Sequence, residues 1–170
     1  MNAETTLTGQ AGPLKRVTLW VRDIDASLRV YHDALGLQVV EDKSLAGPLI
    51  ARQIGLAEAR LRIVHLAAGG LEHGWIGLYA ISDTQPAPMQ SLPRPDGFPR
   101  YGQAAVVLSV QGLAAIVARL RAMPGVQFIT EPTEYRKTTP DDSTPAGIYR
   151  ETIFFDPDGI PVSLMEYTPL

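Results

Sequence analysis

The chain has 170 residues, 45% of them hydrophobic and 19% charged, which is the composition of a folded globular protein and excludes a disordered one. Its formal net charge is −3 and it has no basic block, so we expect no nucleic-acid partner. The absence of cysteine excludes disulfides, thiolate nucleophiles and zinc sites built from Cys. Because no apolar run long enough for a signal peptide or a membrane span is recognisable, we expect a cytoplasmic protein without a membrane partner.

The first half of the chain predicts a strand, a short helix and three further strands. Arg16–Val21 is a β-branched and aromatic run of strand length. Asp25 is the expected N-cap of the helix, whose apolar residues recur at i, i+3 and i+7 from Leu28. Gly36 is expected to end the helix, since glycine tolerates a left-handed backbone there. The three further strands are expected at Leu37–Val40, Arg60–Leu66 and Trp75–Ile81.

The second half repeats the first after a proline-rich connection, which spans Thr84–Tyr101 and is expected to be stiff and extended. Lys15–Val40 superposes on Ala104–Ile129 without a gap, and both segments have the order strand, helix, Gly stop and strand. Glu131–Gly147 is predicted to be a loop. The last two strands, Arg150–Phe155 and Pro161–Tyr167, are expected to be joined by a tight turn with the sequence DPDG.

Each half is therefore expected to be a βαβββ module. The predicted fold class is α+β, with two tandem βαβββ modules that pair to form a curved mixed sheet around a central cleft. The predicted boundaries are an N-terminal tail at 1–13, a first module at 14–83, the connection at 84–101 and a second module at 102–168, all within one structural domain.

Two motifs resemble those of a known family. Val17–Leu37, with the sequence VTLWVRDIDASLRVYHDALGL, and Phe155–Gly159, with the sequence FDPDG, resemble the vicinal oxygen chelate superfamily. That superfamily includes glyoxalases, bleomycin-resistance proteins and extradiol dioxygenases. The resemblance covers nearly the whole chain and is specific for the fold, whereas it does not identify the reaction.

The resemblance implies metal ligands on the first and last strands of each module. Here the four ligand positions fall on Arg16, Gly77, Ala105 and Ser163. An arginine has no lone pair to give, glycine and alanine have no donor side chain, and serine is a poor ligand for these divalent metals. We therefore interpret the chain as a member that lacks the usual metal ligands, and we expect no metal and no cofactor.

Alternation along the strands predicts which side chains face the cleft, because residues two apart on a strand share a face. The expected ligand-binding residues are Arg16, Thr18, Trp20, Trp75, Tyr79, Gln103, Ser163, Met165 and Tyr167. They combine aromatic rings with one cation, which suits a flat or hydrophobic organic molecule that has an anionic or carbonyl oxygen near Arg16. Core filling is the alternative role for most of these aromatic residues.

Arg16 and His73 are the candidate catalytic residues. His73 lies in a Gly-rich hairpin that can bend over a substrate, and the pKa of histidine lies near working pH, although a simple turn residue is the alternative. His65 lies in an apolar strand, where we expect a buried, hydrogen-bonded histidine rather than a catalytic one.

The function that these patterns favour is metal-independent binding of a small aromatic or amphipathic organic molecule, similar to that of bleomycin-resistance proteins. The first alternative is a metal-free lyase or isomerase that uses Arg16 as an oxyanion stabiliser and a His, Tyr or Glu as the acid–base group. The second alternative is a metal-dependent glyoxalase or dioxygenase with atypical ligands. The resemblance also implies a homodimer.

Overall fold

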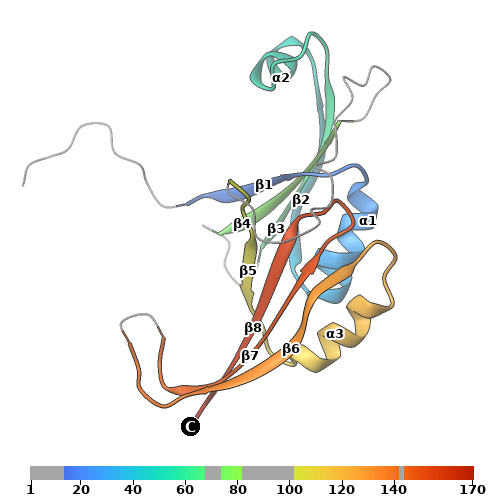
Figure 1. The fold of residues 1–170 in the computed structure, drawn as a ribbon. Coiled ribbons are helices and arrows are strands. Elements are labelled where there is room, and N and C mark those ends of the chain that lie inside the picture. Colours follow the sequence, from blue (N-terminus) through green and yellow to red (C-terminus); the bar gives the residue numbers. More distant parts are fainter. Residues whose placement is uncertain (1–13, 68–73, 82–101, 142–143) are drawn as a thin grey trace, which may run out of the picture.

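The computed structural model describes residues 14–67, 74–81, 102–141 and 144–170, which form two four-stranded mixed sheets (Figure 1). The first sheet has the order β1-β4-β3-β2 and comprises β1 (Arg16–Trp20), β2 (Gln38–Ala46), β3 (Arg60–Ala67) and β4 (Trp75–Ile81). The second has the order β5-β8-β7-β6 and comprises β5 (Val106–Ser109), β6 (Gln127–Lys137), β7 (Gly147–Phe155) and β8 (Pro161–Pro169).

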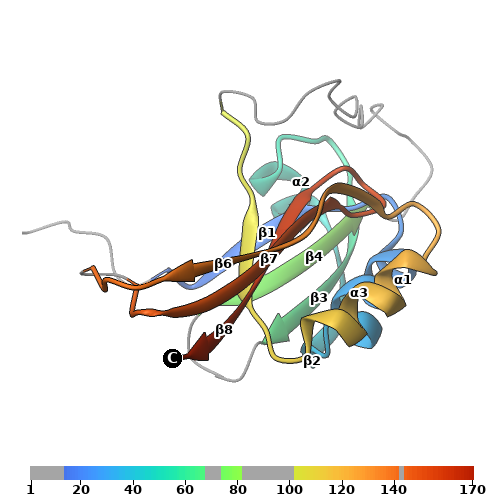
Figure 2. The same ribbon diagram turned by 60° about the horizontal axis from the view of Figure 1, so that its bottom comes forward.

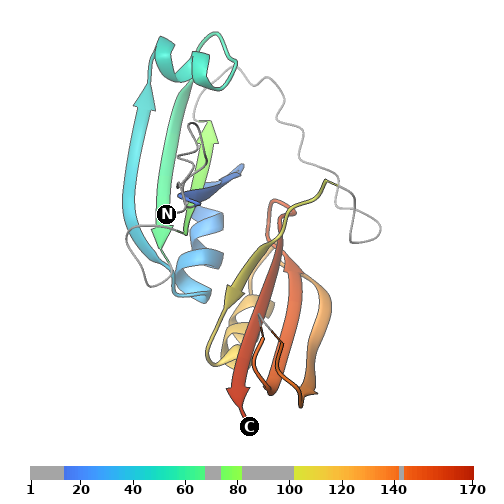
Figure 3. The same cartoon turned by 90° about the vertical axis from the view of Figure 1, so that its left-hand side faces the viewer.

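The two sheets have the same topology, as the internal repeat predicts. In each sheet the first strand pairs in parallel with the last, and the other neighbours are antiparallel. The α+β fold built from two repeated modules is thus confirmed. Figure 3 shows the two sheets as separate units of the molecule, each made from one half of the chain.

The helix of the first module begins earlier than the sequence predicts. α1 (Ile24–Leu28) continues directly into the π-helix η1 (Arg29–Ala34). Its N-cap is Asp23 and not Asp25, because the Asp23 carboxylate accepts hydrogen bonds from the backbone N–H groups of Asp25 and Ala26 at 2.9 and 3.1 Å. Asp25 lies instead in the first turn, where its carboxylate binds Arg62 of β3 at 2.8 Å.

Two further elements differ from the prediction. α2 (Pro48–Gln53) is a short helix after β2 that begins with a proline, a residue that suits the first helical position. The predicted loop at Glu131–Gly147 is wrong in its first part, since β6 continues through Lys137. β6 is an edge strand with register shifts between Phe128 and Thr133, and such irregular edges accommodate a residue without an N–H such as Pro132.

A single hydrophobic core joins the helices to both sheets. The apolar stripe predicted for α3 (Leu113–Arg121) is buried in full. α1 and α3 lie side by side, on one side of the sheets (Figure 2). The other members of the core come from both modules, and the fully buried ones include Val21, Val30, Tyr31, Val64, Leu66, Leu78, Phe154, Val162 and Leu164.

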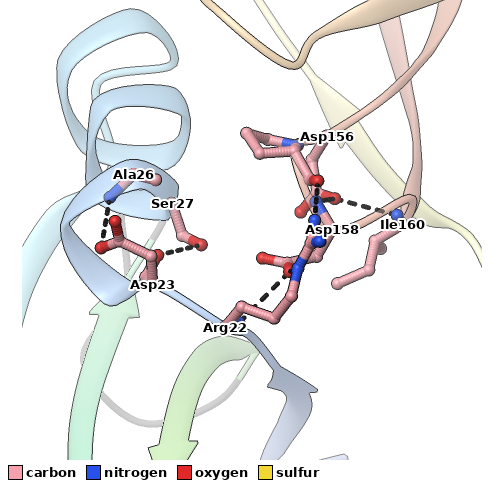
Figure 4. Close-up of polar contacts among 8 residues, drawn as sticks. Arg22, Asp23, Ala26, Ser27, Asp156, Asp158 and Ile160 are labelled. Atoms are coloured by element: carbon pink, nitrogen blue, oxygen red, sulfur yellow. Dashed lines mark hydrogen bonds and ion pairs between the residues drawn. The ribbon is translucent and has the colours of Figure 1, made fainter. Parts of the chain in front are cut away.

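Polar contacts also join the two modules, mainly at the turn between β7 and β8. Arg22, which follows β1, donates from Nε to the Asp158 carboxylate at 2.7 Å (Figure 4). Tyr31 donates to the buried Asp156 carboxylate at 2.9 Å. Gly159 completes the turn with a φ of +86°. The turn predicted from its sequence is therefore also a docking point for the first module.

The expected tail at 1–13, the connection at 84–101 and His73 lie outside the described residues. Within the part of the chain that the structure describes, no helix has the length and apolar character needed to span a membrane.

Candidate functional site

In each sheet one face packs into the core that contains α1, η1 and α3, and the other face points away from that core. In the first sheet Leu19, Ile76 and Leu78 belong to the core, so the alternate residues of β1 and β4 point to the other face. We call this face of the first sheet the first open face and the matching face of the second sheet the second open face. The register of the strands assigns to the first open face Arg16, Thr18, Trp20, Glu41, Lys43, Ile63, His65, Trp75, Gly77 and Tyr79.

The predicted site residues are divided between the two sheets. Arg16, Thr18, Trp20, Trp75 and Tyr79 lie on the first open face, where Arg16 pairs with Trp75 and Trp20 with Tyr79. Their side chains meet, since the Trp20 and Tyr79 ring centroids are 5.5 Å apart and the Arg16 guanidinium carbon is 5.8 Å from the Tyr79 ring centroid. The remaining predicted residues belong to the second module and are Gln103, Ser163, Met165 and Tyr167.

His65 lies at the centre of the first open face. Its Nδ1 is 2.9 Å from a carboxylate oxygen of Glu41, and its Nε2 is 3.2 Å from the Tyr79 hydroxyl. The residue is 5% exposed, and its ring lies 5.5 Å from that of Trp75. The second Glu41 oxygen accepts a hydrogen bond from Lys43 Nζ at 2.8 Å. The structure therefore places a continuous polar chain, which the sequence analysis did not find, beside the predicted residues.

Burial, and then the charged side chains around it, determine the direction of the His65 pKa shift. Burial lowers the pKa of His65 below its ordinary value, and Arg16 and Lys43 lower it further, while Glu41 acts in the opposite direction. The hydrogen bond from Lys43 contributes most to lowering the pKa of Glu41, which is therefore ionised at neutral pH. An ionised carboxylate can only accept, so a neutral His65 has its proton on Nδ1 and its Nε2 accepts from the Tyr79 hydroxyl.

Gly77 lies directly beneath two of these rings. A Cβ atom built at this position would be 2.7 Å from Cε2 of Tyr79 and 3.3 Å from Cδ2 of His65. The first distance is far shorter than a van der Waals contact, so the two rings occupy the space that a side chain at position 77 would need. The glycine is thus required by close packing on the first open face.

Trp75 contributes a buried donor to the same face. Its indole Nε1 is buried and has no hydrogen-bond partner among the described residues. Lys15 Nζ lies 4.7 Å from the centroid of the Trp75 ring, within the range of a cation–π contact. Within the described residues this N–H is therefore an unsatisfied buried donor on the first open face.

The residues at the four implied ligand positions do not fit a divalent metal ion. Position 16 has a cationic arginine, position 77 is covered by the Tyr79 and His65 rings, and positions 105 and 163 have alanine and serine. Across 14–67, 74–81, 102–141 and 144–170, no group of three or more His, Asp or Glu side chains is arranged to hold a metal.

Three tyrosines lie together at one end of the second open face. Tyr149 lies between Tyr135 and Tyr167, with ring centroids 5.2 Å from each. Gly147 packs under the Tyr167 ring so closely that a Cβ atom there would overlap it. The hydroxyls of Tyr149 and Tyr167 donate to backbone carbonyls at 2.7 and 3.1 Å. This end of the second open face is therefore aromatic, and its tyrosine hydroxyls bind the backbone rather than forming a chain with a histidine as on the first open face.

Several solved structures share the fold. A glyoxalase family protein from Bacillus cereus has a TM-score of 0.73 and 19% identity, with 98% of this chain and 99% of that chain covered. An integron cassette protein from the mobile metagenome of V. cholerae has a TM-score of 0.52 and 17% identity, with 95% and 100% covered. A glyoxalase/bleomycin resistance protein/dioxygenase family enzyme from Burkholderia phytofirmans PsJN has a TM-score of 0.51 and 16% identity, with 92% and 100% covered.

The sequence itself provides the assignment to a family. No curated protein matches the chain. A family model described as the Glyoxalase/Bleomycin resistance protein/Dioxygenase superfamily matches residues 14–164, which is most of the chain. The chain therefore belongs to the Glyoxalase/Bleomycin resistance protein/Dioxygenase superfamily.

Proposed function

We propose that this protein binds a small aromatic or amphipathic organic molecule on the first open face, without a metal ion. The observation that carries the proposal is that aromatic side chains fill the space over Gly77. Where the family resemblance implies a metal ligand, the rings of Tyr79 and His65 fill the position, and Arg16 lies against the same Tyr79 ring. An aromatic surface with a cation beside it suits a flat molecule that has an anionic oxygen.

The exposure of the surrounding side chains supports this proposal. Trp20 is 40% exposed although it is a large apolar residue, and Arg16, on the same face of β1 beyond Thr18, is exposed as well. A ring that stacks on Trp20 would cover this apolar surface, while its anionic group would reach the Arg16 guanidinium.

The test uses 4-phenylbutanoate as a probe and isothermal titration calorimetry as the readout. We expect binding by the unaltered protein and weaker binding of the neutral analogue 4-phenylbutanol. Arg16→Met keeps an apolar side chain but removes the charge-assisted hydrogen bond, so we expect an affinity about 10-fold lower or more. Arg52→Met, which alters an exposed arginine on α2, is the matched control and is expected to bind as the unaltered protein does.

Two results would contradict the proposal. One is equal affinity for 4-phenylbutanoate in Arg16→Met and in the unaltered protein. The other is binding that disappears when a chelator is added and returns with a divalent ion.

The metal-free lyase or isomerase is the second candidate function. The specific observation in its favour is the polar chain from Glu41 through His65 to the Tyr79 hydroxyl. A hydrogen-bonded chain of a carboxylate, an imidazole and a phenol contains the group types that acid–base catalysis uses. It lies on the same face as Arg16, so binding and proton transfer would share one site.

A further inference from the structure

We propose that Glu41, His65 and Tyr79 form a proton relay in which the Tyr79 hydroxyl oxygen removes a proton from the carbon next to the carbonyl group of an aromatic oxo acid. The acid is the molecule that the proposed function places at Arg16, so this inference rests on that function and adds a reaction to it. It also specifies the substrate class, because the carboxylate suits Arg16 and the aromatic ring suits Trp20.

The relay is held by three neighbouring strands. Glu41 of β2 pairs with His65 of β3, and His65 pairs with Gly77 of β4, two residues before Tyr79. The strand ladder thus fixes the order carboxylate, imidazole, phenol, with contacts of 2.9 Å and 3.2 Å along it. Groups on adjacent strands of one sheet are positioned more rigidly than groups on loops.

The direction of the hydrogen bonds makes Tyr79 the reacting end. Glu41 accepts the Nδ1 proton of His65, and the free Nε2 accepts the Tyr79 hydroxyl proton. The Tyr79 oxygen therefore donates its proton into the relay and presents its lone pairs to a bound molecule. Tyr79 is half-buried, whereas His65 is covered, so the phenol and not the imidazole is within reach of a substrate.

The charges that face the relay act in both directions, since Glu41 favours a proton on His65, whereas Arg16 and Lys43 lower the pKa of His65 and oppose it. They are Arg16 from β1, Glu41 and Lys43 from β2, and Lys15 near Trp75. The Arg16 guanidinium carbon lies 5.8 Å from the Tyr79 ring centroid, on the face where the carbonyl oxygen of the bound acid would gain negative charge. Glu41 would stabilise the imidazolium that forms on His65.

The proposed step balances without a further reactant. The C–H bond next to the carbonyl group breaks, its electron pair becomes the enolate, and the negative charge develops on the carbonyl oxygen beside Arg16. The substrate proton goes to the Tyr79 oxygen, while the original Tyr79 proton passes to His65 Nε2. Reversal of the two transfers returns a proton to the same carbon, which is exchange and, where that carbon is a stereocentre, allows inversion of its configuration.

The experiment measures hydrogen exchange in D₂O with 4-phenyl-2-oxobutanoate as the probe and the full chain as the catalyst. Proton NMR follows the loss of the C3 protons, and calorimetry measures binding of the same probe. We expect the unaltered protein to accelerate exchange and Tyr79→Phe to reduce that acceleration by about 100-fold or more with little change in affinity. We expect His65→Gln to reduce it by about 10-fold or more, because the phenol loses its proton acceptor.

Tyr135→Phe is the matched control for the phenol. Its hydroxyl also contacts a carboxylate, that of Glu151 at 2.8 Å, but it lies in the second sheet and its loss is expected to leave exchange unchanged. Tyr79→Phe removes a single oxygen and retains the ring, so it keeps the test valid if His65→Gln fails to fold.

The outcomes separate the relay from the binding function. Probe binding without exchange in the unaltered protein overturns the relay and leaves the proposed function standing. Exchange that is equally fast in Tyr79→Phe also overturns the relay. Absence of probe binding counts against the proposed function and the relay together.

Discussion

At Gly77 the backbone of β4 passes beneath the Tyr79 and His65 rings, and this contact provides a direct test of the packing on the first open face. We expect Gly77→Ala to lower the free energy of unfolding by about 1–3 kcal/mol, because the added Cβ must displace the Tyr79 ring. Urea denaturation of the single variant measures this loss.

The matched background for that substitution is Tyr79→Ala. Without the ring we expect Gly77→Ala to be nearly neutral or slightly stabilising, since alanine restricts the unfolded chain more than glycine does. An equal loss of stability in both backgrounds would show that the Tyr79 ring does not fill the space above position 77.

His65 is expected to make the stability of the protein depend on pH just below the ordinary pKa of histidine. Burial is the main cause that lowers its pKa in the folded state below the ordinary value of about 6.5. Between the lowered and the ordinary pKa the unfolded chain binds more protons, so the free energy of unfolding falls as the pH is lowered. We expect His65→Gln to flatten this slope, because the substitution removes the titrating ring. An unaltered slope in His65→Gln would contradict the prediction.

The sequence predicts residue positions well where alternation alone decides them. The β1–β4 register places Arg16, Thr18, Trp20, Trp75 and Tyr79 on one face, as the period of two predicts. It did not identify Glu41 and Lys43, because the strand predicted at Leu37–Val40 ended before them, whereas β2 continues to Ala46. Glu41 and Lys43 are two residues apart in the sequence, so a predicted strand that continued beyond Val40 would have placed them on one face.

At the scale of elements, Tyr31 links η1 to the turn before β8. Asp156 is fully buried, and its carboxylate accepts from Tyr31 and from the backbone N–H groups of Asp158 and Ile160. Burial is the main cause that raises the pKa of Tyr31 well above its ordinary value, so the hydroxyl remains a donor at every working pH. We expect Tyr31→Phe to lower the free energy of unfolding by about 1.5–3 kcal/mol, because a buried carboxyl group loses a partner.

The control for Tyr31 is Tyr135→Phe, which removes an exposed hydroxyl from its bond with Glu151. Its effect on stability is expected to be much smaller, because water replaces the lost partner at an exposed site. Chemical denaturation compares the two variants, and equal losses would contradict a special role for the contact between the modules.

Helices and strands could be predicted where the spacing of apolar residues along the sequence was regular. All four apolar residues of the predicted stripe in α3 are buried, because that helix keeps the 3.6-residue period. The first-module helix changes to a π-helix at Arg29, so the buried residues no longer follow one regular stripe. Part of β6 was predicted as a loop because Pro132 normally interrupts a strand, and only the bulged edge position explains why it is tolerated.

At the scale of the whole molecule, the second open face leaves apolar side chains uncovered. Val107 is 59% exposed and Tyr167 is 40% exposed, and both are large residues on strands that pair with each other in one sheet. We propose, with the homodimer that the family resemblance implies, that a second copy of the chain covers the β5–β8 side of this face, at the opposite edge from Tyr135 of β6. Val107→Asp is expected to shift the dimer toward monomer in sedimentation velocity, because a charge would be buried in the interface.

The control for this prediction is Leu49→Asp, which alters an apolar residue of α2 that is 61% exposed and lies outside the second open face. It is expected to leave the sedimentation coefficient unchanged. A protein that sediments as a monomer before any substitution would contradict the dimer.

The fold could be predicted from two short motifs and one internal repeat, because these features depend on local backbone geometry. A helix that ends at a glycine and a DPDG turn each determine a chain reversal, and their repetition gives two modules of equal topology. The chemistry of the first open face was less accessible, since it depends on which residues of β2, β3 and β4 lie opposite each other. Pairing across strands is a long-range property that no single segment of sequence contains.

The division of the strands has a consequence for genetic engineering of the protein. Every strand of the first sheet comes from residues 16–81 and every strand of the second from residues 106–169, so each ladder is contained in one continuous piece of chain. If the gene were cut between those pieces, each polypeptide would contain every strand of its own sheet. Arg22, Tyr31 and Arg119 would provide polar contacts between the two fragments when they reassociate. Such complementing fragments could each be fused to a different protein, and the recovery of a fluorescent or growth signal would then report that the two fused proteins associate.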